Sequence, residues 1–276
     1  MQNGVIPVPG RCLLLLLALG TALSAGPALS QEGVEDVATG LGVRFVQIQT
    51  PLTLDRGVLE AVFTHRFAEA AKDAGPGALW GLGGGSYVGL GVDYAFLKNV
   101  SVQVYWANSF YDYEFAAKGT LLRPTRKLPV AIGLRGGLDW NTYSGAEKFS
   151  SGFAQLLASA TIADRVTIAV SPSYVQRTRY HDDVWNVPID LQVRILDSWY
   201  LLGELMPKKG WTPDATYQWS VAIQKTVYHH KFALYFGNTL ATTMDQMIGG
   251  DLGGAVTDRN LHIGFNISRA FDLVKN

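Results

Sequence analysis

Residues 100–106 read VSVQVYW, with Val100, Val102, Val104 and Trp106 alternating with Ser101, Gln103 and Tyr105. Residues 189–195 read IDLQVRI and repeat the pattern, with Asp, Gln and Arg between aliphatic residues. A period of two places successive side chains on opposite faces of an extended chain. Each stretch therefore predicts a β-strand with one apolar and one polar face.

The same alternation continues along most of the chain. Similar runs lie at about 57–67, 88–96, 111–115, 130–134, 151–162, 166–170, 198–206, 217–223, 232–236 and 261–267. Together they predict about twelve strands of roughly 9 to 11 residues, the length that a tilted strand needs to cross a bilayer. No helical period is sustained beyond residue 31. The predicted fold is all-β, a transmembrane antiparallel up-and-down β-barrel of about 12 strands.

The predicted connections fall into two classes. Tight turns are expected at 97–99, 163–165, 196–198 and 228–230, and long loops at 68–86, 139–150, 176–187, 207–215 and 241–258. With twelve strands, all the tight turns fall on one side and all the long loops on the other. Short periplasmic turns and long outer loops are typical of outer-membrane barrels. The connections at 108–110 and 119–127 fit this rule poorly.

Composition agrees with interleaved strands. The chain has 276 residues, of which 48% are apolar and 17% charged, and its formal net charge is zero. This balance, without any Lys/Arg-rich run, argues against nucleic acid as a partner. The longest apolar run, Cys12 to Leu19, is too short for a membrane-spanning helix. Strands in which apolar and polar residues alternate explain why the chain is rich in apolar residues yet has no long apolar segment.

The N-terminus has the features of an export signal. Arg11 precedes the apolar segment Cys12 to Ala25, and Ala28-Leu29-Ser30 is a small-x-small cleavage site. We therefore predict a signal peptide over 1–30, a periplasmic N-terminal lead or partial plug over 31–56, and an outer-membrane β-barrel over 57–276. The single cysteine lies in the signal, so the mature chain has neither disulfides nor thiolate metal sites. Outer-membrane lipid and lipopolysaccharide are the expected surroundings.

Several segments resemble one family. They are LEAVFTHRF (59–67), DYEFAAKGTLLR (112–123), GELMP (203–207), HKFALYFGN (230–238) and GFNISR (264–269). In these the chain is similar to a family of outer-membrane β-barrels known mainly as a domain of unknown function, from Bacteroidetes-type and Acidobacteria-type genomes. The chain departs from the family where it reads Gln176-Arg177-Thr178 instead of His-Arg-Asn. The resemblance implies a fold and a compartment, and no activity.

The predicted inward face carries charges of both signs. The candidate lumen-lining residues are Glu60, Arg66, Asp93, Asp112, Glu114, Lys118, Arg135, Asp190, Arg194, Glu204 and His262. Two interpretations stay open. These groups line a water-filled pore for a small polar solute, or they pair into a network that fills the lumen, because unpaired buried charges are costly. Twelve strands lie between filled eight-stranded barrels and open sixteen-stranded ones.

The sequence offers no catalytic constellation, and we predict no metal site and no cofactor. Twelve-stranded outer-membrane phospholipases place a His-x-Ser pair on one face of a strand, whereas His262 is followed at that spacing by Gly264. His181 with Asp182 and Asp183 is interpreted as a solvated loop.

Four functional hypotheses follow. The first is a non-enzymatic channel or scaffold for a small polar solute. The second is a closed barrel that docks another periplasmic or outer-membrane protein, for example an electron-transfer partner. The third is an outer-membrane acyl hydrolase, and the fourth is a soluble secreted barrel with a lipid-like ligand.

Overall fold

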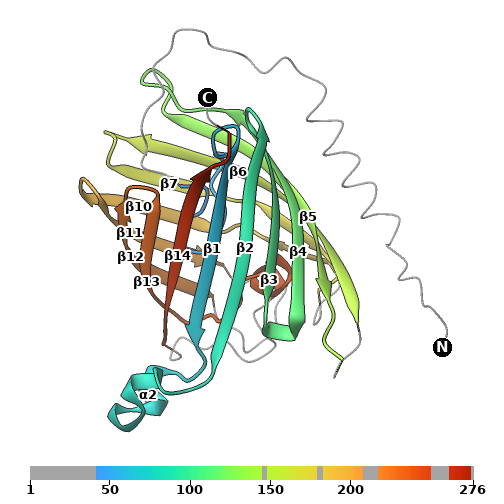
Figure 1. Cartoon of the computed structure of the whole chain (residues 1–276), viewed down its shortest axis with the longest axis vertical. Helices are drawn as coiled ribbons and strands as arrows, with labels where there is room; N and C mark the ends of the chain where they lie inside the picture. Colours follow the sequence, from blue (N-terminus) through green and yellow to red (C-terminus); the bar gives the residue numbers. More distant parts are fainter. Residues whose placement is uncertain (1–41, 145–147, 179–182, 208–216, 250–260, 275–276) are drawn as a thin grey trace, which may run out of the picture.

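The computed structural model describes residues 42–144, 148–178, 183–207, 217–249 and 261–274. These residues form one antiparallel sheet that closes into a barrel (Figure 1). The last strand, β14 (His262–Asp272), pairs with the first, β1 (Val58–Phe67), from Val58 opposite Asp272 to Arg66 opposite Gly264. This pairing closes the ring, and the predicted antiparallel up-and-down barrel is confirmed.

The remaining strand segments follow one another around the ring. They are β2 (Ser86–Leu97), β3 (Val100–Ala107), β4 (Asp112–Leu122), β5 (Val130–Asn141), β6 (Phe149–Ile162), β7 (Val166–Val170), β8 (Ser173–Gln176), β9 (Asp183–Asn186), β10 (Ile189–Leu196), β11 (Trp199–Met206), β12 (Gln218–Val227) and β13 (His230–Gly237).

Fourteen segments make twelve strands, as predicted, because two adjacent strands are interrupted. Pro172 separates β7 from β8, and Pro188 separates β9 from β10. Proline has no N–H to donate to the ladder, so it breaks a regular strand. Both proline carbonyls still accept, from the amides of Leu156 at 3.0 Å and Ser171 at 2.9 Å. Each interrupted strand therefore remains part of the wall.

The period-two alternation matches the two faces of the wall. Polar side chains such as Ser101 and Gln103 are buried, whereas their neighbours Val102 and Val104 are exposed. Large apolar residues on the outer face include Leu90, Val92, Phe115, Leu156, Ile168, Leu191, Leu201, Val221, Ile223, Phe232 and Leu234. Apolar outside and polar inside is the arrangement of a barrel that stands in lipid.

The two ends of the barrel differ, as the predicted connections required. At the end that we call the turn end, β2, β6, β10 and β12 pass into the next strand through two or three residues, and the C-terminal residues lie there as well. At the opposite end, the loop end, residues 68–85 project beyond the barrel and carry α2 (Ala71–Ala74) and η1 (Pro76–Gly81) (Figure 1). The predicted loop 139–150 is shorter, since β5 extends to Asn141 and β6 begins at Phe149.

Helices are short throughout the described chain. Besides α2 and η1 there are η2 (Ser109–Tyr111) and α3 (Met244–Gly249). Among the described residues, no helix combines the length and the apolarity needed to cross a membrane, which leaves the question of crossing by strands untouched.

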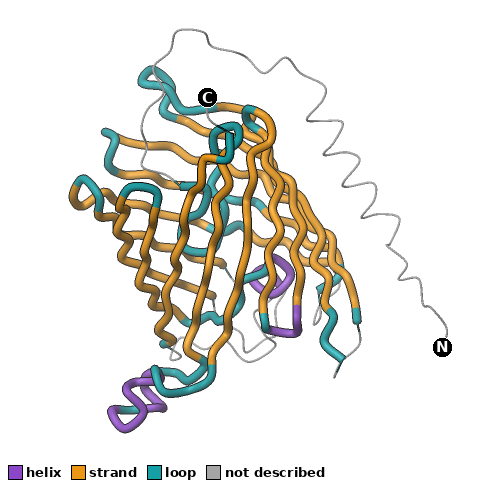
Figure 2. The backbone as a smooth tube through the Cα atoms, in the orientation of Figure 1, coloured by secondary structure: helices purple, strands orange, loops and turns teal. Residues whose placement is uncertain are grey.

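Two segments leave the ring of strands and lie in its lumen (Figure 2). The first, residues 42–56, precedes β1, enters at the turn end and is called the hairpin insert. The second, residues 238–249, follows β13, enters at the loop end, contains α3 and is called the loop insert. Of the stretch 31–56, expected as a periplasmic lead or a partial plug, the described part thus lies inside the barrel, and residues 1–41, with the predicted signal peptide, lie outside the described residues.

Glycines in β2 give the lumen room for one large side chain. A Cβ on Gly89 would stand 1.8 Å from the Tyr105 hydroxyl, and one on Gly91 would stand 2.4 Å from the Tyr105 ring. Tyr105 is almost completely buried, and its hydroxyl lies 2.5 Å from that of Thr64. Only glycine permits this close approach between neighbouring strands.

Candidate functional site

The predicted lumen-lining residues are placed on the inner face of the wall. Ten of them are buried: Glu60, Arg66, Asp93, Asp112, Glu114, Lys118, Arg135, Asp190, Glu204 and His262. Arg194 is only half-buried, because it lies near the turn end of β10, where its amide bonds to the carbonyl of Arg165. The buried groups do not form a single site, and most of them contact one of the two inserts or one another.

The hairpin insert turns back on itself inside the lumen. Arg44 pairs with Gln49 in an isolated antiparallel bridge, and the amide of Thr50 donates to the carbonyl of Val43 at 2.9 Å. The tip, residues 45–48, is almost fully buried. Its backbone amides at 46–48 need acceptors outside the hairpin, since an unpaired buried N–H is costly.

Glu204 on β11 supplies those acceptors. Its Oε1 atom accepts hydrogen bonds from the amides of Val46 at 2.9 Å, Gln47 at 2.6 Å and Ile48 at 2.8 Å. Successive backbone amides that converge on one anion form a nest, a concave site with positive potential. A carboxylate of the wall is thus neutralised by the backbone of the insert.

Other wall residues hold the two arms of the hairpin insert. The Lys118 ammonium donates to Gln49 Oε1 at 3.0 Å and to the carbonyl of Val43 at 3.3 Å. The Asn266 amide donates to the carbonyl of Val46 at 2.7 Å. These contacts come from β4 and β14, so the insert is fastened on several sides of the wall.

A small cavity remains beside the hairpin insert. Its volume is about 30 Å³, and residues on its lining include Arg44, Glu60, Asp93, Gln103 and Asn266. A cavity of about 10–15 Å³ holds one water molecule, so this one has room for ordered water but not for a larger solute. Of the two interpretations of the lumen, this part of the barrel matches the filled one.

The loop insert meets acidic groups on β4 and β5. The amide of Met244 donates to Glu114 Oε2 at 2.9 Å, and the amide of Asp245 donates to Asp139 Oδ2 at 3.2 Å. The Gln246 side chain donates to Asp112 Oδ2 at 2.9 Å. The first turn of α3 is therefore anchored to three carboxylates of the wall.

Arg135 on β5 forms its ion pair with Glu114 and not with these aspartates. Its guanidinium forms an ion pair with Glu114 and donates to Gln103 at 2.6 Å and to Gln155 at 2.9 Å. It also lies over the ring of Phe153, 4.8 Å from the ring centroid. Its positive charge is thus directed mainly to Glu114.

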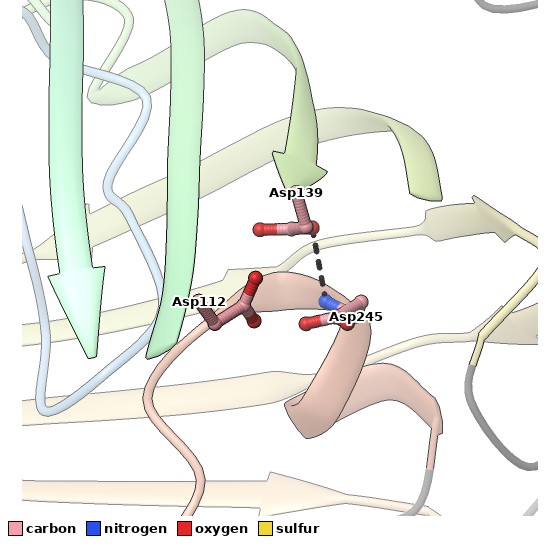
Figure 3. A group of neighbouring side chains, drawn as sticks. All are labelled: Asp112, Asp139 and Asp245. Carbon is pink, nitrogen blue, oxygen red and sulfur yellow. Dashed lines mark hydrogen bonds between the residues drawn. The ribbon is translucent and has the colours of Figure 1, made fainter. Parts of the chain in front are cut away.

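Three aspartates come together where the loop insert meets the wall. Asp112, Asp139 and Asp245 are all buried, and each has a carboxylate oxygen within 4.8 Å of those of the other two (Figure 3). Burial raises the pKa of Asp245 above its ordinary value. We call these residues the aspartate cluster, and it has the donor type of a metal site.

The sequence predicts no metal site and does not reveal the aspartate cluster. Asp112 is one of the predicted lumen-lining residues, whereas Asp139 lies at the start of a predicted loop and Asp245 lies within another. The three residues belong to β4, β5 and α3, so no short motif joins them. The signal available was an acidic residue in each segment, without any sign of their proximity.

The two inserts meet in an apolar cluster inside the barrel. Ile48 of the hairpin insert belongs to the same cluster of buried residues as Met244, Met247 and Ile248 of the loop insert. Phe153 and Met206 contribute from the wall. The lumen thus has an apolar core between two polar ends.

Apart from the sequence neighbours His229 and His230, the described histidines lie in different strands. His262 Nδ1 lies 3.2 Å from the carbonyl oxygen of Phe67. His65 stacks on Phe265, and His230 stacks on Phe232. Of the segment interpreted as a solvated loop, His181 and Asp182 lie outside the described residues, whereas Asp183 begins β9.

Comparisons with solved structures find membrane barrels at low similarity. Acinetobacter baumannii outer membrane protein Omp33 is 11% identical, with 77% of this chain and 97% of that chain covered and a TM-score of 0.42. Escherichia coli outer membrane phospholipase A is also 11% identical, with 79% and 91% covered and a TM-score of 0.43. A mutant of Rh. blastica porin is 9% identical, with 67% and 55% covered and a TM-score of 0.35. Likeness at this level carries no functional inference.

A comparison with curated proteins finds no match. A family model described as a membrane bound beta barrel domain matches residues 41–271, which span the hairpin insert and the whole ring of strands. The resemblance seen in the sequence is confirmed, and the chain belongs to this family of membrane-bound β-barrel domains, DUF5777.

Proposed function

We propose that this protein is a non-enzymatic barrel of the bacterial outer membrane that is closed at rest and serves as a scaffold for another envelope protein. The observation that carries the proposal is the occupied lumen. The hairpin insert and the loop insert enter from opposite ends and share one apolar cluster. A barrel filled in this way offers surfaces rather than a passage.

Placement in the outer membrane is supported by the wall and by the N-terminus. The wall has an even number of antiparallel strands, tight turns at one end and long loops at the other, as bacterial outer-membrane barrels do. The predicted signal peptide agrees with export. Outer-membrane lipid and lipopolysaccharide are then the molecules that contact the apolar outer face.

The loop end supplies a surface suited to a partner. In the projecting segment 68–85, Leu79 and Trp80 are more than half exposed and Leu82 is also exposed. Exposed apolar groups that project beyond a barrel have no lipid to cover them, and such patches mark sites of interaction. We place the docking surface for the partner protein there.

Conductance tests the closed lumen. We expect the refolded full chain to give no conductance steps in a planar bilayer. Steady opening of the unmodified chain would contradict the closed scaffold.

Capture of the partner from native envelopes tests the docking surface. The change Trp80→Ser is expected to reduce recovery of the partner, with Tyr228→Ser as the matched control, since Tyr228 is an exposed aromatic residue at the turn end. Equal recovery with both variants would remove the loop end from the proposal.

A gated channel for a small polar solute is a second candidate, favoured by one observation. The wall around the hairpin insert is polar, with Lys118, Gln103 and Gln224 buried in it. An inner face of this kind suits water and solute once the insert has left. If the protein is a gated channel, deletion of residues 43–52 is expected to create conductance. A deletion variant that folds but shows no conductance would exclude the channel.

A further inference from the structure

The aspartate cluster holds more negative charge than its neighbours neutralise. Three carboxylates stand within 4.8 Å of one another, and Glu114 lies next to them on β4. The basic side chain that acts on the cluster, Arg135, is already paired with Glu114. Buried like charges at this separation repel strongly unless a proton or a cation lies between them.

Orphaned oxygen atoms are a second observation that points to a ligand. Asp112 Oδ1 and Asp139 Oδ1 have no hydrogen-bond partner among the described residues, although these side chains are only 0% and 1% exposed. Figure 3 shows the carboxylate of Asp139 turned toward those of Asp112 and Asp245, with the oxygen that bears no hydrogen bond on the Asp112 side. Buried polar atoms in native proteins almost always have partners. Two buried oxygens without one therefore point to a ligand that binds them.

The remaining contacts hold the carboxylates in place and leave these oxygens free. Thr243 Oγ1 lies 2.8 Å from Asp112 Oδ2 and 3.0 Å from Asp245 Oδ1. The Gln246 amide and the backbone of α3 bind Asp112 Oδ2 and Asp139 Oδ2. In each wall aspartate, therefore, a donor of the protein binds Oδ2 and none binds Oδ1, while the carboxyl group of Asp112 also lies within hydrogen-bonding distance of that of Asp245.

The donor set selects the class of ion. Carboxylate and hydroxyl oxygens are hard ligands, which suit Ca²⁺, Mg²⁺ and Mn²⁺ rather than metals that prefer thiolate or imidazole. Two oxygens bound to one Ca²⁺ at about 2.3–2.6 Å stand at most about 5 Å apart. The 4.8 Å limit on the cluster is within that span, whereas the shorter bonds of Mg²⁺ require a tighter arrangement.

We propose that Asp112, Asp139 and Asp245 bind one Ca²⁺ ion inside the lumen. The ion joins β4 and β5 of the wall to the first turn of the loop insert. It neutralises the excess charge and supplies the partner that the two orphaned oxygens lack. Ca²⁺ therefore fixes the loop insert in the lumen, and this site is independent of whether the barrel acts as a scaffold or as a channel.

Binding is tested on the folded full chain in detergent after treatment with a chelator. Equilibrium dialysis with radioactive Ca²⁺ is expected to give one ion per chain, and added Ca²⁺ is expected to raise the unfolding temperature. The double change Asp112→Asn with Asp139→Asn is expected to abolish both effects. Asp190→Asn is the matched control, because Asp190 is equally buried in the wall but lies opposite Glu204, away from the cluster.

The outcomes separate the alternatives. Absence of Ca²⁺ binding by the folded chain would overturn the proposal, as would equal loss of binding in the control variant. If the double variant does not fold, Asp245→Asn replaces it, since this residue lies on an insert and not in the wall. Its affinity is expected to fall by at least the roughly 10- to 100-fold that follows loss of a group supporting a metal ligand. Unchanged Ca²⁺ affinity in Asp245→Asn would remove the loop insert from the site and refute the proposal.

Discussion

The two inserts meet buried carboxylates of the same wall in different ways. At the hairpin insert, one carboxylate, Glu204, receives three backbone amides, so the protein itself supplies hydrogen-bond donors to this anion. At the loop insert, Asp245 adds a third carboxylate to Asp112 and Asp139, so the protein alone leaves the charge unbalanced. We therefore expect an ion to matter for the position of the loop insert and not for the contact between Glu204 and the hairpin insert.

The largest expected effect follows from removing the Glu204 carboxylate, which binds the tip of the hairpin insert. Glu204→Leu removes the acceptor of three buried amides, each of which costs about 1–3 kcal/mol when left unpaired. We expect the free energy of unfolding to fall by about 3–6 kcal/mol, measured by urea titration in detergent. Asp190→Asn, which alters the residue opposite Glu204 on β10 but leaves the Glu204 carboxylate in place, is the comparison variant. A loss under about 1 kcal/mol, with the amides of the hairpin tip still protected from hydrogen exchange, would contradict this account.

The next effect tests whether the inserts depend on each other. Ile48→Ala removes a fully buried side chain from the apolar cluster and is expected to cost about 2–4 kcal/mol. A double-mutant cycle with Ile248→Ala is expected to give a coupling energy of about 0.5–3 kcal/mol, because both residues belong to one cluster. Strict additivity would show that the two inserts are held by the wall alone.

A smaller effect on stability has the opposite sign and distinguishes the contacts of the two inserts. In the presence of a chelator, Asp245→Asn is expected to stabilise the protein by about 1–2 kcal/mol, because it reduces the repulsion among three buried carboxyl groups. Glu204→Gln is expected to destabilise it under the same conditions, since it weakens charge-assisted bonds to the amides. Thermal unfolding of both variants measures the difference. The same sign for both would mean that the two ends are held alike.

The smallest expected effect concerns an ion pair at the turn end. Lys231 lies 3.1 Å from Glu60 and is one quarter exposed, and Glu60 also accepts from Ser268 at 2.6 Å. Lys231→Gln is expected to cost about 1 kcal/mol or less, since partly solvated pairs contribute little. A loss above about 3 kcal/mol in the same titration would indicate that Lys231 is essential to the hairpin insert, as a buried pair would be.

Sequence predicted the wall well because its signal is local. In Ile189–Leu196 the alternation alone assigns Asp190 and Gln192 to the inner face, and both are buried. The interruptions at Pro172 and Pro188 follow from the missing N–H of proline. The number of strands and the two kinds of connection were predictable for the same reason, since each depends on a few neighbouring residues.

The filling of the lumen could not be predicted in the same way. Residues 42–56 have no sustained period, and their position depends on Glu204, more than 150 residues away. The partner of Asp245 is Asp139, 106 residues earlier in the chain. Such contacts are decided by which groups can be paired inside the closed barrel, and no spacing in the sequence records that choice.

The order of elements along the chain links the filling of the barrel to its closure. The hairpin insert directly precedes β1, and the loop insert lies in the connection that leads into β14. These are the two strands whose pairing closes the ring. During assembly, the step that joins the first strand to the last therefore brings both inserts together, so the barrel acquires its core at the moment when it loses its open edges.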